Sequence, residues 1–240
     1  MARKRVAILI SGRGSNMAAL IEAATDPAYP AEIALVLSNR ADAAGLGRAT
    51  ERGIKTEIVD HKRFADREAF ERTLHSTLEQ HRIDLVCLAG FMRVLTPWLL
   101  SRWVSRIINI HPSLLPSFPG LDTHQRALDA GVRVHGATLH FVAPQVDAGP
   151  IIVQGAVAVD PRDTEAELAA RVLAVEHRIY PLALRLIAEN QVEIVDGRCR
   201  IAGADVPSGT LIVPGAISLS TCTRPEPCSL FGLSARLPDA

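Results

Sequence analysis

The chain has 240 residues, of which 48% are hydrophobic, enough to bury a sizeable core. Its 26 basic residues balance 26 acidic ones, so no overall field favours nucleic acid or an anionic membrane, and an anionic ligand needs a local site. No stretch approaches the roughly 20 apolar residues of a membrane-spanning helix, and apolar residues 6–10 are too few for an export signal. We therefore expect a cytoplasmic protein whose partner is a small molecule, with no nucleic-acid or membrane partner.

The first 110 residues alternate short β-branched runs with helical patterns. The runs predict strands over residues 6–10, 33–37, 56–59, 85–89 and 107–110. Their near-continuous apolar character indicates that both faces of the sheet are covered. Helices are predicted where Met17, Leu20, Ile21 and Ala24 recur at helical spacing, and over 66–81 and 97–104. The alternation predicts an α/β fold, a doubly wound, mostly parallel sheet with a Rossmann-like N-terminal half.

The pattern changes after residue 131. Two longer strands are predicted over residues 132–142 and 151–159. A helix follows, opened by Thr164 and Glu167 as a capping box, and we expect Pro181 to bend or interrupt it. Residues 1–202 form one predicted domain, and residues 203–240, rich in Pro, Gly and Ser, are expected to be a loosely ordered tail.

Four cysteines are present, without a Cys-x-x-Cys pair. Cys87 lies inside an apolar run, where a buried reduced thiol is the usual state. We therefore predict no metal site.

A glycine-rich turn, Ser11-Gly12-Arg13-Gly14-Ser15-Asn16, follows the first strand and opens the first helix. The free amides of a helix start can bind an anion, and glycine lets the backbone approach it closely. A plain turn with Ser15 or Asn16 as N-cap explains the segment equally well. Met17 stands where a dinucleotide fingerprint needs a small residue, and the Gly-Lys-Ser/Thr of a triphosphate loop is absent, so a phosphate monoester fits better.

Asn109 and His111 lie two apart at the carboxyl end of a predicted strand, so their side chains leave the same face at the ligand-binding edge. An amide and an imidazolium are suitable donors to an oxygen that becomes negative when an amine attacks a carbonyl. Asp147, in a turn before the last strand, would orient His111 and favour its protonated form. A satisfied polar pair and an ordinary Asp-containing turn are the plainer alternatives.

These segments together resemble the folate-dependent formyltransferases. The resemblance rests on Ser11-Gly12-Arg13-Gly14-Ser15-Asn16, Leu88-Ala89-Gly90-Phe91-Met92-Arg93, Asn109-Ile110-His111-Pro112-Ser113-Leu114-Leu115-Pro116 with Pro119-Gly120, and Asp147-x-Gly149-Pro150. The Gly-Ser-Asn turn and Glu176-His177 with Tyr180-Pro181 narrow it to the phosphoribosylglycinamide formyltransferases of purine synthesis. It covers about residues 4–198.

The resemblance implies formyl transfer from 10-formyltetrahydrofolate to glycinamide ribonucleotide without a metal. The catalytic residues would be Asn109, His111 and Asp147. Gly14, Ser15 and Asn16 would hold the substrate phosphate, and Glu176 the ribose or glycinamide part. The folate would lie against Met92, Arg93, Val94, Leu95 and Asn109, with Arg67 near its carboxylate end and Val146 in the loop 143–147 over the pterin. A homodimer is compatible with these expectations.

Three rival functions stay open at this point. A formyltetrahydrofolate hydrolase and a methionyl-tRNA formyltransferase share the Asn-His-Asp site. The hydrolase usually carries an added N-terminal domain, whereas the first strand here begins near residue 6, and the tRNA enzyme needs a further basic domain. A noncatalytic nucleoside-monophosphate binding module would show phosphate binding without formyl transfer.

Overall fold

The computed structural model describes residues 2–203, 209 and 211–213. The tail expected over residues 203–240 lies almost entirely outside the described residues. The domain boundary near residue 202 therefore stays a prediction.

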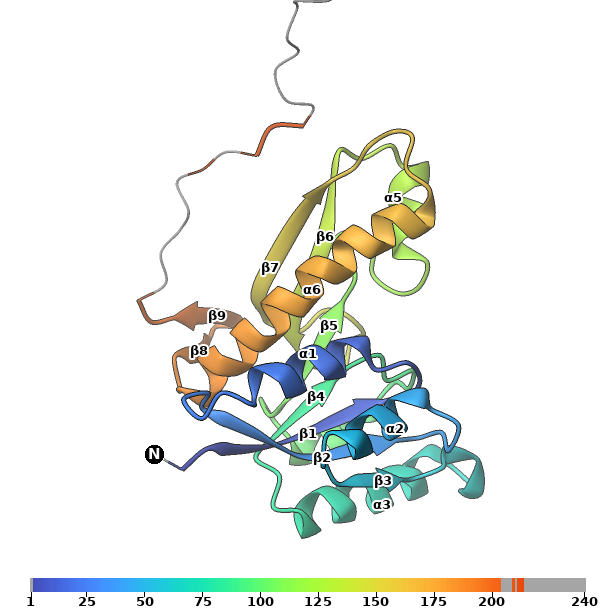
Figure 1. Cartoon of the computed structure of the whole chain (residues 1–240), viewed down its shortest axis with the longest axis vertical. Helices are drawn as coiled ribbons and strands as arrows, with labels where there is room; N and C mark the ends of the chain where they lie inside the picture. The colour runs from blue at the N-terminus through green and yellow to red at the C-terminus, as the bar shows by residue number, and fades with distance from the viewer. Residues whose placement is uncertain (1, 204–208, 210, 214–240) are drawn as a thin grey trace, which may run out of the picture.

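One seven-stranded sheet forms the centre of the molecule, with the strand order β3-β2-β1-β4-β5-β6-β7 (Figure 1). Its strands are β1 (Lys4–Ile10), β2 (Ala31–Ser38), β3 (Thr56–Ile58), β4 (Leu85–Leu88), β5 (Ile107–His111), β6 (Val134–Phe141) and β7 (Ile151–Ala158). The first five strands pair in parallel, whereas β6 and β7 are antiparallel to their neighbours. The predicted α/β class with a mostly parallel sheet is confirmed.

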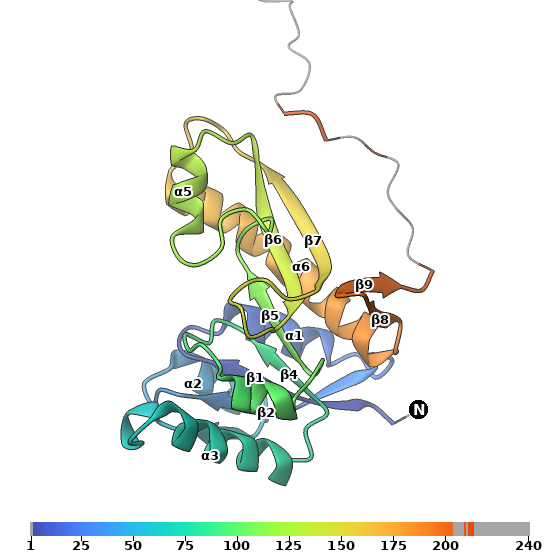
Figure 2. The same cartoon turned by 180° about the vertical axis from the view of Figure 1, so that it is seen from behind.

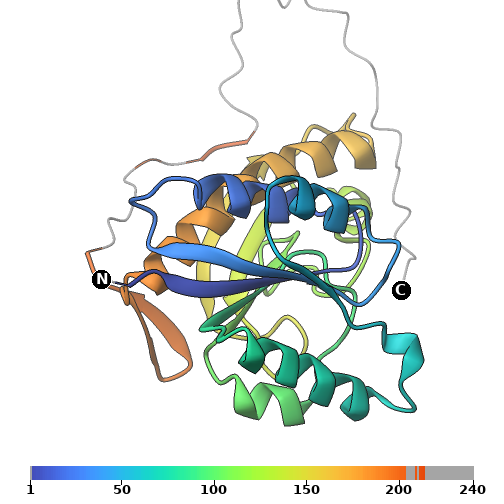
Figure 3. The same cartoon turned by 60° about the horizontal axis from the view of Figure 1, so that its bottom comes forward.

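Helices cover both faces of the sheet, as the apolar strands predict (Figure 3). They are α1 (Ser15–Ala23), α2 (Ala44–Glu51), η1 (His61–Arg63), α3 (Arg67–Gln80), α4 (Pro97–Arg102), α5 (Thr123–Asp129) and α6 (Glu165–Ala188). Alternate residues of β1 enter different cores: Val6 and Ile8 pack with α1 and α6, whereas Ala7 and Leu9 pack with α3 and α4. Both faces of this strand are therefore buried, because its side chains alternate.

The chain leaves β1 and β4 toward opposite faces of the sheet. The helix that follows β1 is α1, in one core, and the helix that follows β4 is α4, in the other. Because β1 and β4 are neighbours, their carboxyl ends form the switch point at which open α/β sheets bind ligands. The glycine-rich turn after β1 lies at this point.

The predicted capping box of α6 is confirmed: Thr164 and Glu167 exchange side-chain and backbone hydrogen bonds. Of the two outcomes expected at Pro181, a bend or an interruption, the interruption is wrong, because α6 continues through Pro181 to Ala188. Its neighbours Tyr180 and Leu184 are fully buried against the sheet side. Burial of this face outweighs the single backbone hydrogen bond that a proline removes.

A small hairpin follows α6, and the sequence reasoning missed it. Its strands are β8 (Val192–Val195) and β9 (Arg198–Ile201), beside the end of α6 and away from α5 (Figure 2). Asp196 and Gly197 join them with positive φ angles of 50° and 72°, the conformation that a two-residue hairpin turn requires. Helices α2 and α5, of eight and seven residues, were also missed.

Candidate active site

The three predicted catalytic side chains gather at the junction of β5, β6 and the loop before β7. His111 Nδ1 lies 3.4 Å from Asp147 Oδ2. Asn109 joins this pair through His140, whose Nε2 lies 3.3 Å from Asn109 Nδ2 and 3.8 Å from Asp147 Oδ1. Residues from three segments of the chain thus form one polar cluster.

The backbone around Asp147 folds the loop back toward β5. The Phe141 amide donates to the Pro150 carbonyl at 2.9 Å, and a Cβ on Gly149 would lie 1.8 Å from the Phe141 carbonyl oxygen, so only glycine fits there. Asp147 itself has a φ of 54°, and its Oδ2 accepts from the Gly120 amide at 2.9 Å. The carboxylate is therefore held between two loops and faces His111.

His111 is buried, with 5% of its surface exposed. Its Nε2 lies 3.0 Å from the Phe118 carbonyl oxygen, and its Nδ1 faces Asp147. Both ring nitrogens face oxygen acceptors, an arrangement that accommodates a proton on each. The structure thus gives His111 the surroundings of a hydrogen-bond donor.

His140 is the site residue that sequence reasoning missed. Burial lowers its pKa, while the Phe141 carbonyl and the Asp147 carboxylate oppose the shift. His140 Nδ1 lies 2.9 Å from the Phe141 carbonyl, which can only accept, so in the neutral ring Nε2 is bare and accepts from Asn109. His140 lies directly opposite Asn109 in the β5–β6 pair. This register would have identified His140, but no local sequence pattern reveals how two strands are paired.

The glycine-rich turn begins α1 without a side-chain cap. Gly14 is the N-cap with a φ of 72°, and neither Ser15 nor Asn16 caps the helix, contrary to the plain-turn alternative. Gly14 also packs closely, since a Cβ there would lie 3.2 Å from the Gly45 Cα. The amides at the start of α1 are therefore open to a ligand, as an anion site requires.

The Asn16 side chain points to α6 instead. Its Nδ2 donates to Glu176 Oε2 at 2.6 Å, although the two residues are 160 positions apart. Both are buried, and Asn16 Oδ1 has no hydrogen-bond partner among the described residues. Burial raises the pKa of Glu176, and the Asn16 hydrogen bond partly offsets this. An unpaired buried amide oxygen beside a carboxylate is suited to a polar ligand.

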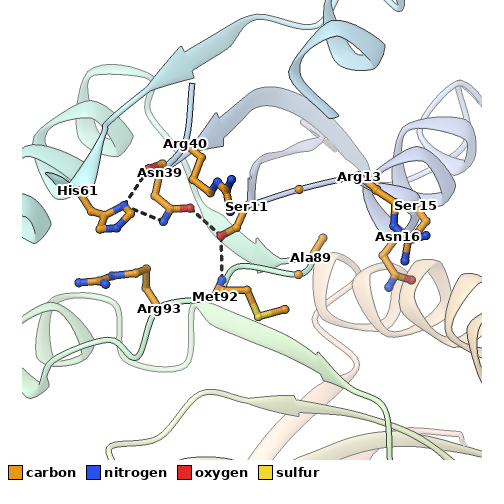
Figure 4. Close-up of a pocket in the computed structure, with 13 residues that line it drawn as sticks. Ser11, Arg13, Ser15, Asn16, Asn39, Arg40, His61, Ala89, Met92 and Arg93 are labelled. Atoms are coloured by element: carbon orange, nitrogen blue, oxygen red, sulfur yellow. Dashed lines mark hydrogen bonds between the residues drawn. The ribbon is translucent and has the colours of Figure 1, made fainter. Parts of the chain in front are cut away.

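A cavity of about 530 Å³ opens over the turn (Figure 4). Its lining includes Gly14 and Asn16 from the turn, Asn39 and His61 from the ends of β2 and β3, and Arg93 from the segment after β4. The predicted phosphate turn and part of the predicted folate segment therefore face one space.

The remaining predicted folate residues differ in exposure. The side chains of Met92, Val94 and Val146 are 70%, 51% and 52% exposed, as a ligand surface would be. Leu95 instead packs in the core, so its side chain does not face that surface. Arg67 begins α3 outside the cavity lining.

Within residues 2–203, no group of three or more His, Cys, Asp or Glu side chains is arranged to hold a metal ion. None of the helices in this part of the chain is long and apolar enough to cross a membrane.

A scan against protein-family models matches residues 4–184 to the formyl transferase model. The chain belongs to the formyl transferase family. The match spans β1 to α6 and so includes the turn, the His111 cluster and Glu176. The predicted family is confirmed.

Two relatives differ in length: this chain spans a small part of the first and nearly all of the second. The chain is 48% identical over 192 residues to the trifunctional purine biosynthetic protein adenosine-3 of Homo sapiens, covering 80% of this chain but only 19% of that protein. It is 41% identical over 202 residues to the phosphoribosylglycinamide formyltransferase of Escherichia coli K12, covering 84% of this chain and 95% of that one.

Solved structures of the family share the fold. Glycinamide ribonucleotide transformylase 1 from Symbiobacterium toebii has a TM-score of 0.81 at 46% identity, covering 83% of this chain and 94% of that one. A formyltetrahydrofolate deformylase from Pseudomonas syringae has a TM-score of 0.77 at 31% identity, covering 83% of this chain and 66% of that one. The fold is thus shared by a transformylase and a deformylase.

Proposed function

We propose that this formyl transferase moves the formyl group of 10-formyltetrahydrofolate to the amine of glycinamide ribonucleotide, giving formylglycinamide ribonucleotide and tetrahydrofolate. The observation that carries the proposal is the buried Asn16–Glu176 pair beside the uncapped turn of α1. A deformylase, which gives the formyl group to water, needs no site for a phosphorylated amine. Relatives named as phosphoribosylglycinamide formyltransferases support the same choice.

The acceptor would bind along the turn and α6. The amides of Ser15 and Asn16, at the positive end of α1, would hold its phosphate. Glu176 would accept hydrogen bonds from the ribose or glycinamide part, because Asn16 binds its Oε2 and, among the described residues, no side chain binds its Oε1. The amine would then point along the sheet edge toward β5.

The transfer would take place at the His111 cluster. The amine nitrogen attacks the formyl carbon, a carbon–nitrogen bond forms, and the oxygen becomes an oxyanion. The second amide hydrogen of Asn109 and Nε2–H of His111, displaced from the Phe118 carbonyl, would donate to that oxygen. Collapse breaks the bond to folate N10, which takes a proton as the amine loses one, and Asp147 keeps His111 oriented throughout.

The folate would lie on the segment after β4. Met92 and Val94 present exposed apolar surface for the rings, and Arg93 lies at the cavity. Arg67 would attract the carboxylate end, and Val146, next to Asp147, would cover the pterin. Holding both substrates side by side replaces a bimolecular encounter, a major source of rate in group transfer.

The deciding experiment measures tetrahydrofolate release from 10-formyltetrahydrofolate with and without glycinamide ribonucleotide. We expect release only when the ribonucleotide is present, with formylation of its amine detected by mass spectrometry. Release of formate without the ribonucleotide would identify a deformylase instead. Ribonucleotide binding without any formyl transfer would indicate a noncatalytic binding module.

A further inference from the structure

Ser11 joins the phosphate turn to the folate segment by two hydrogen bonds. Its amide donates to the Gly90 carbonyl at 3.1 Å, and its Oγ accepts from the Met92 amide at 2.8 Å. Ser11 is the first residue after β1, so the turn at Gly12–Asn16 continues directly from it. One buried residue thus holds the loop after β4 against the turn after β1.

The hydrogen bonds of Ser11 continue into a directional chain (Figure 4). Because Ser11 Oγ already accepts from Met92, its own hydrogen goes to Asn39 Oδ1, 2.6 Å away. This fixes the Asn39 amide with Nδ2 toward His61 Nδ1 at 3.1 Å. Asn39 is 2% exposed, so its side chain is largely buried among these partners.

This series of hydrogen bonds crosses the carboxyl ends of four strands. Ser11 follows β1, Asn39 follows β2, His61 begins η1 after β3, and Met92 follows β4. His61 Nδ1 also lies 3.0 Å from the Asn39 carbonyl, so this one nitrogen either accepts from Asn39 Nδ2 or donates to that carbonyl, according to the ring tautomer. These hydrogen bonds therefore connect the loops at the carboxyl ends of the four strands, in addition to the backbone pairing between the strands.

We propose that Ser11, Asn39 and His61 are positioning residues that set the separation between the phosphate turn (residues 11–16) and the folate segment (residues 92–95). We call this chain the Ser11 relay. The inference rests on the proposed function, because it assigns the two segments to the two substrates. Because these hydrogen bonds join the two segments, we expect a ligand that holds one segment in place to strengthen binding at the other, and the coupling free energy is the same in both directions.

A fixed separation matters for this chemistry because the reacting atoms must approach to about 3–3.5 Å before transfer. Loss of the Ser11 hydroxyl leaves the Met92 amide without its partner and frees the Asn39 side chain. A purely structural role for these buried groups would lower only the unfolding free energy. A positioning role also lowers turnover and the coupling between substrates.

The test compares Ser11→Ala with Tyr180→Phe. The Tyr180 hydroxyl is also buried and donates to the backbone at the end of β4, to the Leu88 carbonyl at 3.0 Å, but it does not contact residues 90–92. Both variants lose one buried hydroxyl, so their unfolding midpoints control for stability. Tetrahydrofolate is titrated with and without glycinamide ribonucleotide, and kcat and both KM values are measured.

We expect Ser11→Ala to lose about tenfold in kcat/KM for the folate, the effect of one buried hydrogen bond, and to lose the coupling seen in the titration. Tyr180→Phe should keep both. Asn39→Ala should resemble Ser11→Ala, and the double variant should be no worse than either single one, because both residues belong to one chain. Asn39→Asp keeps an oxygen for Ser11 and should retain more coupling than Asn39→Ala.

Coupling in Ser11→Ala equal to that of the parent, or effects of Ser11→Ala and Asn39→Ala that add, would overturn the relay. A parent protein that transfers no formyl group would overturn the proposed function instead. The two failures are distinguishable, because transfer by the parent is measured separately from coupling in the variants.

Discussion

At the scale of single residues, the candidate site depends on the direction of each hydrogen bond. Burial lowers the pKa of His140 and so favours its neutral ring, whose Nε2 accepts from Asn109 rather than donating. The second hydrogen of the Asn109 amide is then left for a substrate oxygen. In the proposed mechanism Asp147 orients the other donor, because its carboxylate faces His111 Nδ1.

We expect Asn109→Ala and His111→Ala each to reduce kcat by about 100- to 1,000-fold, the range measured for loss of one oxyanion donor. Thermal unfolding followed by circular dichroism should show that both variants fold. Turnover close to that of the parent in both variants would contradict the proposed site.

The backbone at Gly14 supports a second prediction. Its positive φ of 72° disfavours any side chain, and a Cβ there would lie 3.0 Å from the Met17 Cε. Gly14→Val should therefore raise the KM for glycinamide ribonucleotide at least about tenfold, while tetrahydrofolate still binds in a direct titration. Parallel loss of folate affinity would indicate misfolding of β1 and α1, and unchanged ribonucleotide binding would place the phosphate elsewhere.

At the scale of elements, α6 packs closely on β7 at Gly155, a residue without a side chain. A Cβ on Gly155 would lie 2.2 Å from the Val175 Cγ1 and 3.2 Å from the Ile179 Cγ2. The helix can therefore approach the strand closely only because residue 155 is glycine. Glu176 directly follows Val175 in α6, so this contact also helps to place Glu176 beside the phosphate turn.

Gly155→Ala should lower the unfolding free energy by about 1–3 kcal/mol, the cost of overpacking a filled core. Adding Val175→Ala removes the nearest clashing atom, so the double variant should recover part of the loss. Denaturant unfolding measures both values. If the double variant loses as much unfolding free energy as the two single variants lose together, the two residues do not share this contact.

At the scale of the whole molecule, the sheet separates two cores, and the buried His135 lies on the same face of β6 as Ala137 and Leu139 of the α6-side core. Burial, together with smaller contributions from nearby His124 and His111, lowers the pKa of His135 to about 4. Burial also lowers the pKa of His124, whose ring centroid lies 5.4 Å from that of His135. These rings must therefore gain protons when the chain unfolds in mild acid.

The sign of the resulting pH dependence follows from proton binding. Between pH 6.5 and about 4 the unfolded chain binds a proton at His135 that the folded chain does not, so stability should fall as pH falls through this range. His135→Phe keeps an aromatic ring beside Phe118 and should show a shallower fall. Denaturant unfolding at several pH values measures the difference, and identical slopes would contradict the assignment.

The sequence by itself determined much of the fold. Apolar runs and helical spacing predict all seven strands of the main sheet and four of the helices near their observed bounds, because periods of 2 and 3.6 depend only on local backbone geometry. The capping box at Thr164 and the pairing of Asn109 with His111 on one strand face are local for the same reason. The sequence left open whether the helix continues past Pro181, since burial of its neighbours in α6 is not a local property.

Only the tertiary structure decided which distant residues meet. Asn16 reaches Glu176 across 160 positions, His140 faces Asn109 through an antiparallel register, and Ser11 meets Met92 across the β1–β4 switch point. Such contacts depend on strand order and on which face each helix covers. These follow from burying all apolar surfaces at once, and no local pattern of residues encodes them.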